Sequence, residues 1–189
     1  DWEEKINAIV DETVNQNMTL ISGIPPWVQM YFEKIIDKKG KKIGDIFKNF
    51  SLFIYGGVNF KPYKNTFDQL IGRKINSIEL YPASEGFFAF QDEVDSESLL
   101  LILNNAIYYE FIKTDDLLKG KENYISLSEV KVGVNYALII STASGLWRYN
   151  IGDTIKFTEL SPYRIIVTGR VKHFISAFGE HVITNEVET

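Results

Sequence analysis

Three segments in the first 72 residues place apolar side chains at the three- and four-residue spacing of a helix face. They predict helices over residues 2–14, 25–40 and 61–72. The first begins with acidic residues that suit the helix dipole, and the second begins at a proline pair, which the first turn of a helix tolerates. Gly40 and Gly72 end the second and third helices, because glycine readily adopts the left-handed conformation found there.

Short apolar runs between these helices predict β-strands. The runs are MTLISG at residues 18–23, SLFIYGG at 51–57 and KINSIELY at 74–81. Strands that alternate with helices pair in parallel through right-handed crossovers. We therefore expect residues 1–96 to form an α/β part with a parallel sheet and flanking helices.

After the third of these strands, apolar runs follow one another without helical segments between them. Asn104-Asn105 separates two runs and is a hairpin signal, while Ser144-Gly145 and Gly152-Asp153 predict further turns. The run YRIIVTGR at 163–170 predicts a last strand. Residues 97–170 are expected to form an antiparallel, barrel-like β part. The predicted fold class is therefore α/β, with a parallel sheet and flanking helices followed by the antiparallel part.

The composition describes a chain that can bury a core, and it excludes several classes of function. Of its 189 residues, 45% are hydrophobic and 14% aromatic, so we do not expect disorder. A formal net charge of −5 argues against a general nucleic-acid or anionic-membrane surface. The absence of cysteine excludes disulfides and thiolate chemistry, and it fits a reducing, cytoplasmic compartment. No apolar run approaches the roughly 20 residues that a membrane helix needs.

Both ends of the sequence predict a partial domain. The chain starts at Asp1 rather than at methionine, and residues 171–189 form a polar segment without a core of its own. We interpret residues 171–189 as a hinge followed by the start of a further domain.

Polar residues follow two of the predicted parallel strands, at the sheet edge where ligands bind in open α/β folds. Ser84 and Glu85 come after the run at 74–81, and Gly56-Gly57 end the run at 51–57. One interpretation is an ordinary polar turn in each case. The other is a nucleotide site, in which Ser84 contacts a phosphate, Glu85 holds Mg²⁺ through an oxygen, and the glycines let another group approach the backbone.

Charged residues at later strand ends are the other candidates. Asp153, after a glycine, is either common turn chemistry or an acceptor for two neighbouring hydroxyls of a ribose. Arg170, Lys172 and His173 crowd together after the last strand, as expected of a linker or an anion contact. The two histidines are too few for a metal centre, and no G-x-G-x-x-G, P-loop or G-x-S-x-G pattern occurs.

The order of these motifs carries a resemblance that no single motif carries. An aromatic residue with Ser-Glu three residues later, then Tyr-x-x-Gly-Asp, then Gly-Arg-x-Lys is the order found in adenylate-forming enzymes. It is carried by YPASEGFFAF at 81–90, YYEF at 108–111, GLWRYNIGD at 145–153 and GRVKHFISAFGEHV at 169–182. The sequence resembles the acyl-acid amido synthetases of the auxin-responsive (Gretchen Hagen) family, within the adenylate-forming, firefly luciferase-like superfamily.

The resemblance implies an ATP-dependent ligase. In the implied reaction, ATP and a carboxylic acid give an acyl adenylate and pyrophosphate, and an amino acid's amine then forms the amide. The implied cofactors are ATP and Mg²⁺, the implied partners are a small carboxylic acid and an amino acid, and neither nucleic acid nor a membrane takes part. The chain would be the central and β-rich part of an N-terminal adenylation domain, without the phosphate loop and the mobile C-terminal domain. Such a piece is expected to fold but not to adenylate by itself.

The resemblance also implies a role for each matching residue. Ser84 and Glu85 would face the phosphates, and Glu85 would be a catalytic residue and the Mg²⁺ ligand. Asp153 would hold the ribose hydroxyls, with Arg170 near the ribose or phosphate. Lys172 would be a catalytic residue at the interdomain hinge. The other implied cofactor-binding residues are Gly56 and Gly57 beside the adenine, Tyr81, and Tyr108 in the nucleotide or acyl pocket.

Two positions depart from the family pattern, and two alternatives stay open. Pro82 stands where many adenylating enzymes have glycine, and Asn150 stands where a basic residue is common. One alternative is a non-catalytic nucleotide-binding or partner-binding module of the same fold. The other is an acyl-CoA ligase, which transfers the acyl group to a thiol. A nucleotide site would require Glu85 and Asp153 to open onto one shared cleft.

Overall fold

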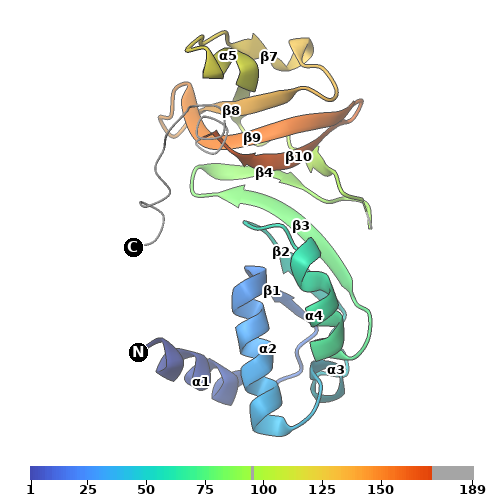
Figure 1. Cartoon of the computed structure of the whole chain (residues 1–189). Helices are drawn as coiled ribbons and strands as arrows, with labels where there is room; N and C mark the ends of the chain where they lie inside the picture. The colour runs from blue at the N-terminus through green and yellow to red at the C-terminus, as the bar shows by residue number, and fades with distance from the viewer. Residues whose placement is uncertain (95, 172–189) are drawn as a thin grey trace. The chain divides into compact units, whose positions relative to one another are not determined.

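The structure, a computed structural model, describes residues 1–94 and 96–171 (Figure 1). Contacts divide the chain into two units: Asp1–Pro82 with Phe90–Ser96, and Ala83–Ala89 with the residues from Glu97 onward. None of the helices in the described part of the chain is long and apolar enough to span a membrane.

The first unit is a small parallel sheet with helices, as the alternating pattern predicts. Its elements are α1 (Trp2–Thr13), β1 (Leu20–Ser22), α2 (Pro25–Lys39), α3 (Ile43–Ile46), β2 (Leu52–Tyr55), α4 (Lys61–Ile71) and β3 (Asn76–Ala83). The strand β2 pairs in parallel with β1 on one side and with β3 on the other, so that Phe53 lies opposite Ile21 and Ser77. The predicted parallel pairing of these apolar runs is confirmed.

Prolines and glycines set the ends of α2 and α4. Helix α2 begins at Pro25 and α4 has Pro62 in its first turn, where the missing N–H leaves no hydrogen bond unmade. Gly40 and Gly72 end the two helices with φ angles of 63° and 82°. Both predicted glycine stops are therefore confirmed, and the reason is the left-handed backbone that glycine adopts without strain.

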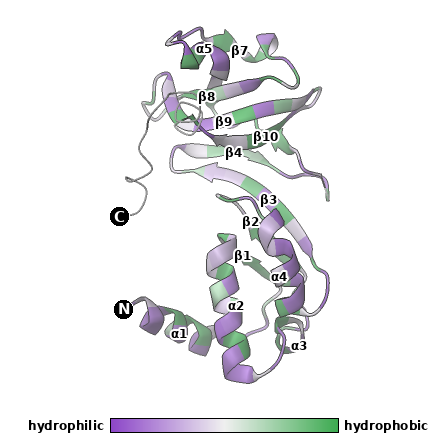
Figure 2. Cartoon of the chain, in the orientation of Figure 1, coloured by the Kyte–Doolittle hydropathy of each residue, from purple (hydrophilic) through white to green (hydrophobic). Residues whose placement is uncertain are grey.

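Aromatic side chains form the centre of the first unit's core. Phe32 from α2, Phe53 from β2 and Phe67 from α4 are each at most 2% exposed. The ring centroid of Phe67 lies 4.9 Å from that of Phe53 and 5.6 Å from that of Phe32. These aromatic contacts add to the stabilisation from burial. Hydrophobic and polar residues share α2 and α4 (Figure 2), so these amphipathic helices can bury one face on the sheet.

Arg73 ties the segment after α3 to the end of α4. Its guanidinium donates hydrogen bonds to the backbone carbonyls of Gly44 at 2.8 Å, Lys48 at 3.0 Å and Phe50 at 2.7 Å. A Cβ atom on Gly44 would lie 2.7 Å from the carbonyl oxygen of Ile71, so only glycine permits this approach. One side chain thus satisfies carbonyls that the short helix and loop leave unpaired.

The second unit is an antiparallel sheet. Its elements are β4 (Gly86–Phe90), β5 (Leu99–Leu101), β6 (Ile107–Lys113), α5 (Thr114–Leu118), β7 (Ile125–Ser126), the 3₁₀ turn η1 (Leu127–Glu129), β8 (Asn135–Thr142), β9 (Tyr149–Leu160) and β10 (Tyr163–Arg170). The strand order is β4-β5-β10-β9-β8-β6-β7, and the pairs from β5 to β7 in this order are antiparallel. The predicted fold class, α/β with an antiparallel part after the parallel sheet, is confirmed.

The hairpin predicted around Asn104-Asn105 is wrong. β5 pairs with β10, whereas β6 pairs with β7 and β8, so the two apolar runs are not neighbours in the sheet. The side-chain amide of Asn105 instead donates to the carbonyl of Phe87 at 2.8 Å and to the hydroxyl of Tyr109 at 3.2 Å. The asparagines therefore belong to a loop between distant strands, because each strand finds better apolar partners elsewhere in the sheet.

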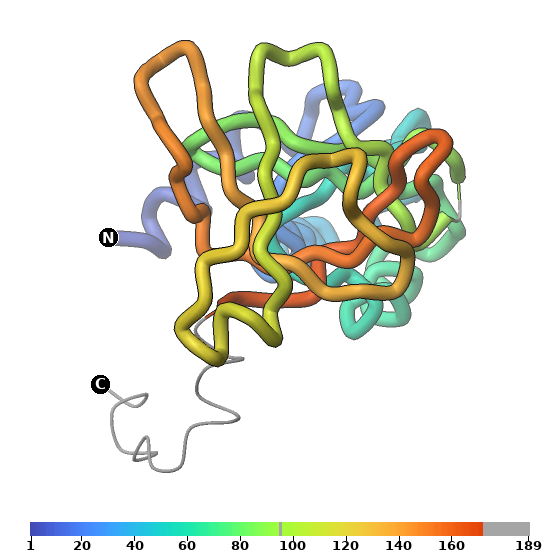
Figure 3. Tube along the Cα trace, turned by 90° about the horizontal axis from the view of Figure 1, so that it is seen from above, coloured from blue at the N-terminus to red at the C-terminus, as the bar shows by residue number. Residues whose placement is uncertain are grey.

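The turn predicted at Gly152-Asp153 is also wrong. Both residues lie inside β9, a strand of 12 residues. Gly152 has a φ of 82°, and the pairing of β9 with β8 shifts register between Ala137 and Ile139. The glycine therefore marks an irregularity within a strand rather than its end. The turn predicted at Ser144-Gly145 is confirmed, and it forms the projecting loop between β8 and β9 (orange in Figure 3).

The core of the second unit lies on one face of its central strands. Phe111 of β6, Tyr136 of β8 and Phe157 of β9 are fully buried, with the centroids of Phe111 and Phe157 5.3 Å apart. Side chains alternate along a strand, so the residues next to these aromatics point to the opposite face. Glu110 and Tyr108 lie on that second face, together with a smaller buried apolar cluster that includes Ile112, Ala137 and Ile139.

We expect Arg73→Ala to lower the free energy of unfolding by about 1–3 kcal/mol, because four backbone carbonyls lose a charged donor. Urea unfolding followed by tryptophan fluorescence measures this, since Trp2 and Trp27 both lie in the first unit. Lys74→Ala, at the exposed neighbouring residue, is the matched control and should leave the unfolding midpoint unchanged. Equal midpoints for the two variants would show that the carbonyls do not depend on Arg73.

Candidate functional site

Ser84 and Glu85 form the two-residue turn between β3 and β4. β3 extends to Ala83, so the motif lies at the tip of two strands and not in a connection toward a helix. Ser84 is exposed and Glu85 is half-buried. Within the described residues no ion pair involves Glu85, so its carboxylate oxygens are available to a ligand.

Glu85 fits a nucleotide-bound magnesium better than a metal site made of protein ligands alone. Across residues 1–94 and 96–171, no group of three or more acidic or histidine side chains could hold a metal ion. Mg²⁺ keeps several water molecules and usually binds through one or two carboxylates together with substrate phosphates. A single carboxylate at the strand tips is compatible with that coordination.

Asp153 and Arg170 lie opposite each other on β9 and β10. The Nε of Arg170 lies 2.8 Å from Oδ1 of Asp153, and the side chains are 63% and 13% exposed. The carboxylate is thus largely buried beneath a guanidinium that reaches solvent. An acceptor and several charged donors at one place suit a ligand that carries both hydroxyls and an anion.

The backbone before Asp153 also depends on local contacts. The N–H of Gly152 donates to Oδ1 of Asn150 at 2.9 Å. A Cβ atom on Gly152 would lie 3.5 Å from Arg170, an ordinary contact, so the positive φ and not the space demands glycine here. Asn150 takes part in shaping the strand next to Asp153, which gives this unusual residue of the motif a local role.

Gly56, Gly57 and Tyr81 lie in the first unit. A Cβ atom on Gly56 would lie 2.7 Å from the carbonyl oxygen of Leu80, so close packing of β3 against this turn explains the glycine. Gly57 has a φ of 81°, which favours glycine whether or not a ligand is present. Tyr81 is 7% exposed. These three residues are compatible with a binding role, and that role stays a prediction.

Sequence reasoning missed a pair of ionisable groups next to these glycines. Tyr55, the last residue of β2, lies opposite Glu79 in the middle of β3. Burial raises the pKa of the Glu79 carboxyl, against the hydrogen bond donated by the Tyr55 hydroxyl, which lowers it. Burial and the neighbouring carboxylate also raise the pKa of Tyr55. Only the parallel register reveals this pair, because the two residues are far apart in the sequence.

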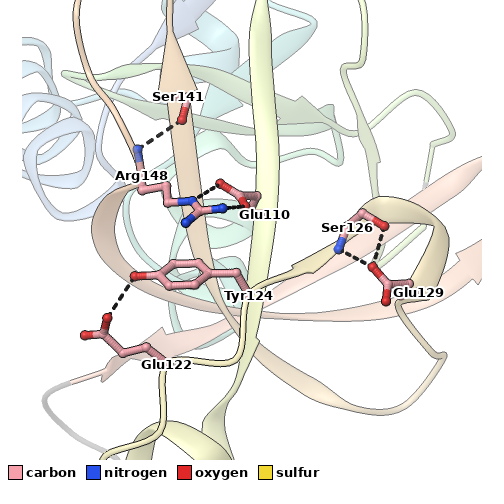
Figure 4. Close-up of polar contacts among 7 residues, drawn as sticks. All are labelled: Glu110, Glu122, Tyr124, Ser126, Glu129, Ser141 and Arg148. Carbon is pink, nitrogen blue, oxygen red and sulfur yellow. Dashed lines mark hydrogen bonds and ion pairs between the residues drawn. The ribbon is translucent and has the colours of Figure 1, made fainter.

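A second cluster that the sequence did not indicate surrounds Glu110 of β6 (Figure 4). Arg148 donates from Nε and Nη2 to the two oxygens of Glu110 at 3.1 and 3.0 Å. The Glu110 side chain is 10% exposed and that of Arg148 is 61% exposed. The guanidinium lies 4.6 Å from the ring centroid of Tyr124, and the Arg148 N–H donates to Ser141 at 3.0 Å. The motif GLWRYNIGD contains Arg148, but the motif does not indicate that Glu110 is its partner.

Tyr108 lies on the same face of β6 as Glu110, because two residues separate them along the strand. It is opposite Ser141 of β8 and 60% exposed. Its ring is therefore accessible beside the Arg148 cluster, which agrees with the prediction that Tyr108 lines a pocket but does not test it.

The second unit thus holds five of the predicted site residues: Ser84, Glu85, Tyr108, Asp153 and Arg170. Lys172 lies outside the described residues. Two shallow depressions of about 390 and 520 Å³ lie along α1 and α2, and neither is lined by a predicted site residue. The shared cleft expected for Glu85 and Asp153 stays a prediction.

Comparison with protein families matches residues 100–170 to the GH3 family central domain. The chain is 33% identical over 90 residues to a probable indole-3-acetic acid-amido synthetase of Oryza sativa subsp. japonica, covering 42% of this chain and 15% of that protein. It is 31% identical over 120 residues to a jasmonoyl-L-amino acid synthetase of Nicotiana attenuata, covering 60% and 21%. The chain therefore spans about a fifth or less of the length of these relatives.

Solved structures show the same fold. An acyl acid amido synthetase from the GH3 family, in complex with 2,4-DB, has a TM-score of 0.54 at 19% identity, over 67% of this chain and 22% of that one. An open conformation of a 2-hydroxyisobutyryl-CoA ligase, in complex with 2-HIB-AMP and CoA, has a TM-score of 0.63 at 13% identity, over 87% and 36%. At these identities the likeness concerns the fold alone.

We expect Glu79→Gln to change how stability depends on pH. Because the folded-state pKa of Glu79 is raised above the ordinary value of 4.5, folding binds protons, and wild-type stability falls as pH rises through that folded-state pKa. The variant should lack this loss and gain stability relative to wild type as pH rises above about 4.5. Urea unfolding at a series of pH values measures it. Glu12→Gln, at an exposed glutamate, is the control, and parallel curves for Glu79→Gln and wild type would contradict the assignment.

Proposed function

We propose that this chain is part of an ATP-dependent acyl-acid amido synthetase, because residues 100–170 match the GH3 family central domain. The matched segment includes Tyr108, Asp153 and Arg170, and this single match carries the proposal. Relatives named as indole-3-acetic acid-amido and jasmonoyl-L-amino acid synthetases support it. The fold, shared with a structure that holds an acyl-AMP, supports nucleotide chemistry.

The proposed reaction has two steps. A carboxylate oxygen of the acid attacks the α-phosphorus of ATP, an acyl–AMP bond forms and pyrophosphate leaves. The amine of an amino acid then attacks the activated carbonyl, the amide forms, AMP leaves, and the amine loses a proton. The first step joins two anions, so the site has to neutralise charge and hold the carboxylate in line with the leaving group.

Asp153 and Arg170 hold the ribose side of the nucleotide in this proposal. A carboxylate accepts hydrogen bonds from two neighbouring hydroxyls, and the exposed guanidinium places its remaining donors beside the phosphate. Their contact at 2.8 Å supports a joint role, since the guanidinium fixes the carboxylate before a ligand arrives. Tyr108 lines the nucleotide or acyl pocket, and Gly56, Gly57 and Tyr81 belong to the adenine side.

Ser84 and Glu85 face the phosphates, with Glu85 as a ligand of Mg²⁺. Magnesium, when bound, supplies charge neutralisation at the phosphate oxygens. The exposed hydroxyl of Ser84 donates to a phosphate oxygen, and the half-buried carboxylate of Glu85 sits where a cation would balance it. Lys172 is proposed as the catalytic residue at the hinge. The cysteine-free composition suits a reducing compartment, and we place the protein in the cytoplasm.

Two measurements on the complete protein distinguish this function from the alternatives. Pyrophosphate release that requires ATP and a carboxylic acid distinguishes an enzyme from a non-catalytic nucleotide-binding module. Mass spectrometry of the product, with amino acids and coenzyme A supplied together, distinguishes an amide from a thioester. An amide supports the proposal, and a thioester or the absence of pyrophosphate release overturns it.

We expect Asp153→Ala in the complete protein to weaken ATP binding by about 1.5–3 kcal/mol, or roughly 10- to 100-fold in Kd, because the ribose loses hydrogen bonds to a charged acceptor. Isothermal titration calorimetry measures the change. Asp115→Ala, at an exposed aspartate of the same unit, controls for the loss of one negative charge. Unchanged affinity in Asp153→Ala would remove Asp153 from the site.

We expect Glu85→Ala to act mainly on the rate of adenylation and not on ATP affinity, because it disturbs the metal that stabilises charge in the transition state. Pyrophosphate release should slow by roughly tenfold or more. The Mg²⁺ concentration that gives half-maximal rate should also rise. Asp115→Ala, at an exposed aspartate of the second unit, should change neither quantity. If Glu85→Ala keeps the wild-type Mg²⁺ dependence, Glu85 is not a metal ligand.

A further inference from the structure

Arg148 has hydrogen-bonding capacity that the protein does not use. A guanidinium carries five N–H donors, and Glu110 accepts from two of them. The other three have no acceptor within the described part of the chain, and the side chain is 61% exposed. Arg148 therefore neutralises a buried carboxylate and still presents one edge of its guanidinium to solvent.

The guanidinium is held by two side chains, and the backbone of Arg148 is held by a third. Both carboxylate oxygens of Glu110 accept hydrogen bonds from the guanidinium, and the ring centroid of Tyr124 lies 4.6 Å from Cζ of Arg148. The backbone N–H of Arg148 is anchored by Ser141 at 3.0 Å. A planar donor that is fixed before binding loses less entropy when it pairs with a planar acceptor.

The backbone at Arg148 is in an uncommon conformation for a residue with a side chain. Its φ is 45°, in the left-handed region, which is strained for a residue other than glycine. Salt bridging to Glu110 alone does not require this conformation, because an arginine side chain is long and flexible. Together with the fixation, the strain indicates that the position of the free guanidinium edge matters.

The surroundings of the free edge suit a small molecule that has an aromatic or apolar part. Tyr108, 60% exposed, lies opposite Ser141, whose hydroxyl accepts a hydrogen bond from the Arg148 backbone. Trp147, the preceding residue, is 82% exposed at the end of the projecting loop between β8 and β9 (Figure 3). Accessible aromatic rings beside a fixed cation are typical of binding surfaces.

We propose that the free edge of Arg148 binds a carboxylate of a small-molecule ligand. A planar carboxylate matches two parallel N–H donors, and this match gives a geometric preference for carboxylates over a spherical anion such as chloride. Because Glu110 already offsets the charge of Arg148, geometry and paired hydrogen bonds carry the recognition, and net charge contributes little. Two ligands of the proposed reaction carry carboxylates, namely the acyl acid and the amino acid, so this inference adds a subsite to the proposed function.

The binding can be measured without turnover, by following the Nε–H resonances of the arginines in ¹H–¹⁵N NMR spectra. The probes are aspartate for the amino acid and indole-3-acetate for the acyl acid, each titrated at constant ionic strength against chloride. We expect a saturating shift of the Arg148 resonance with at least one of the two. Saturation by aspartate alone assigns the subsite to the amino acid, saturation by indole-3-acetate alone assigns it to the acid, and saturation by both supports a general carboxylate site.

Arg148→Lys keeps the positive charge beside Glu110 but removes the planar pair of N–H donors. We therefore expect the affinity for the bound probe to fall by about tenfold. The probe's own resonances report this affinity in the variant. A double variant, Arg148→Gln with Glu110→Gln, removes both charges without leaving either buried alone and should abolish binding. Arg73→Lys is the matched control, because the Arg73 guanidinium is already engaged by backbone carbonyls: stability should fall and carboxylate binding should not change.

Two results would overturn the inference. One is a linear shift that chloride reproduces, and the other is unchanged probe affinity in Arg148→Lys. Neither depends on adenylation, so a complete protein that releases no pyrophosphate can still pass this test, and an active enzyme can fail it.

Discussion

Desolvation of carboxylates is the constraint on which the polar architecture of this chain depends. Glu79, Glu110 and Asp153 are all removed from most of their water by strands that pair tightly around them, and an unpaired buried charge is expensive. Each is compensated in a different way. Arg148 pairs both oxygens of Glu110, Arg170 contacts one oxygen of Asp153, and Glu79 has the neutral hydroxyl of Tyr55.

The type of compensation decides what each carboxylate can do. The carboxylate of Asp153 contacts a guanidinium at 2.8 Å, and a carboxylate is a strong acceptor for hydroxyl groups. Within residues 1–94 and 96–171 no cation pairs with Glu79, and burial raises the pKa of its carboxyl. In both pairs the arginine is more exposed than the carboxylate, so N–H donors of its guanidinium reach solvent above a buried acceptor.

The sheet provides the rigidity that these pairs need. β9 pairs on both sides, with β8 and β10, and its alternation sends Phe157 and Ile155 into the core while Thr154 points to the polar face. Thr154 is fully buried yet satisfied, because Thr168 donates to it at 2.9 Å. Buried residues fix the register of these strands, so Asp153 and Arg170 meet without any local signal between them.

Local signals in the sequence determined the elements and their ends. Pro25, Gly40 and Gly72 act within one turn of backbone, which is why the helices of the first unit could be predicted from spacing and composition. The order of the motifs likewise pointed to a family of ligases.

Tertiary structure decided what the sequence could not. The hairpin expected at Asn104-Asn105 failed because strand partners are chosen by the whole sheet, and Gly152 proved to be a bulge within β9 rather than a turn. For the same reason the pairs Tyr55–Glu79 and Glu110–Arg148 became visible only in the fold: strand register brings together residues that are distant in sequence, and no local pattern encodes that register.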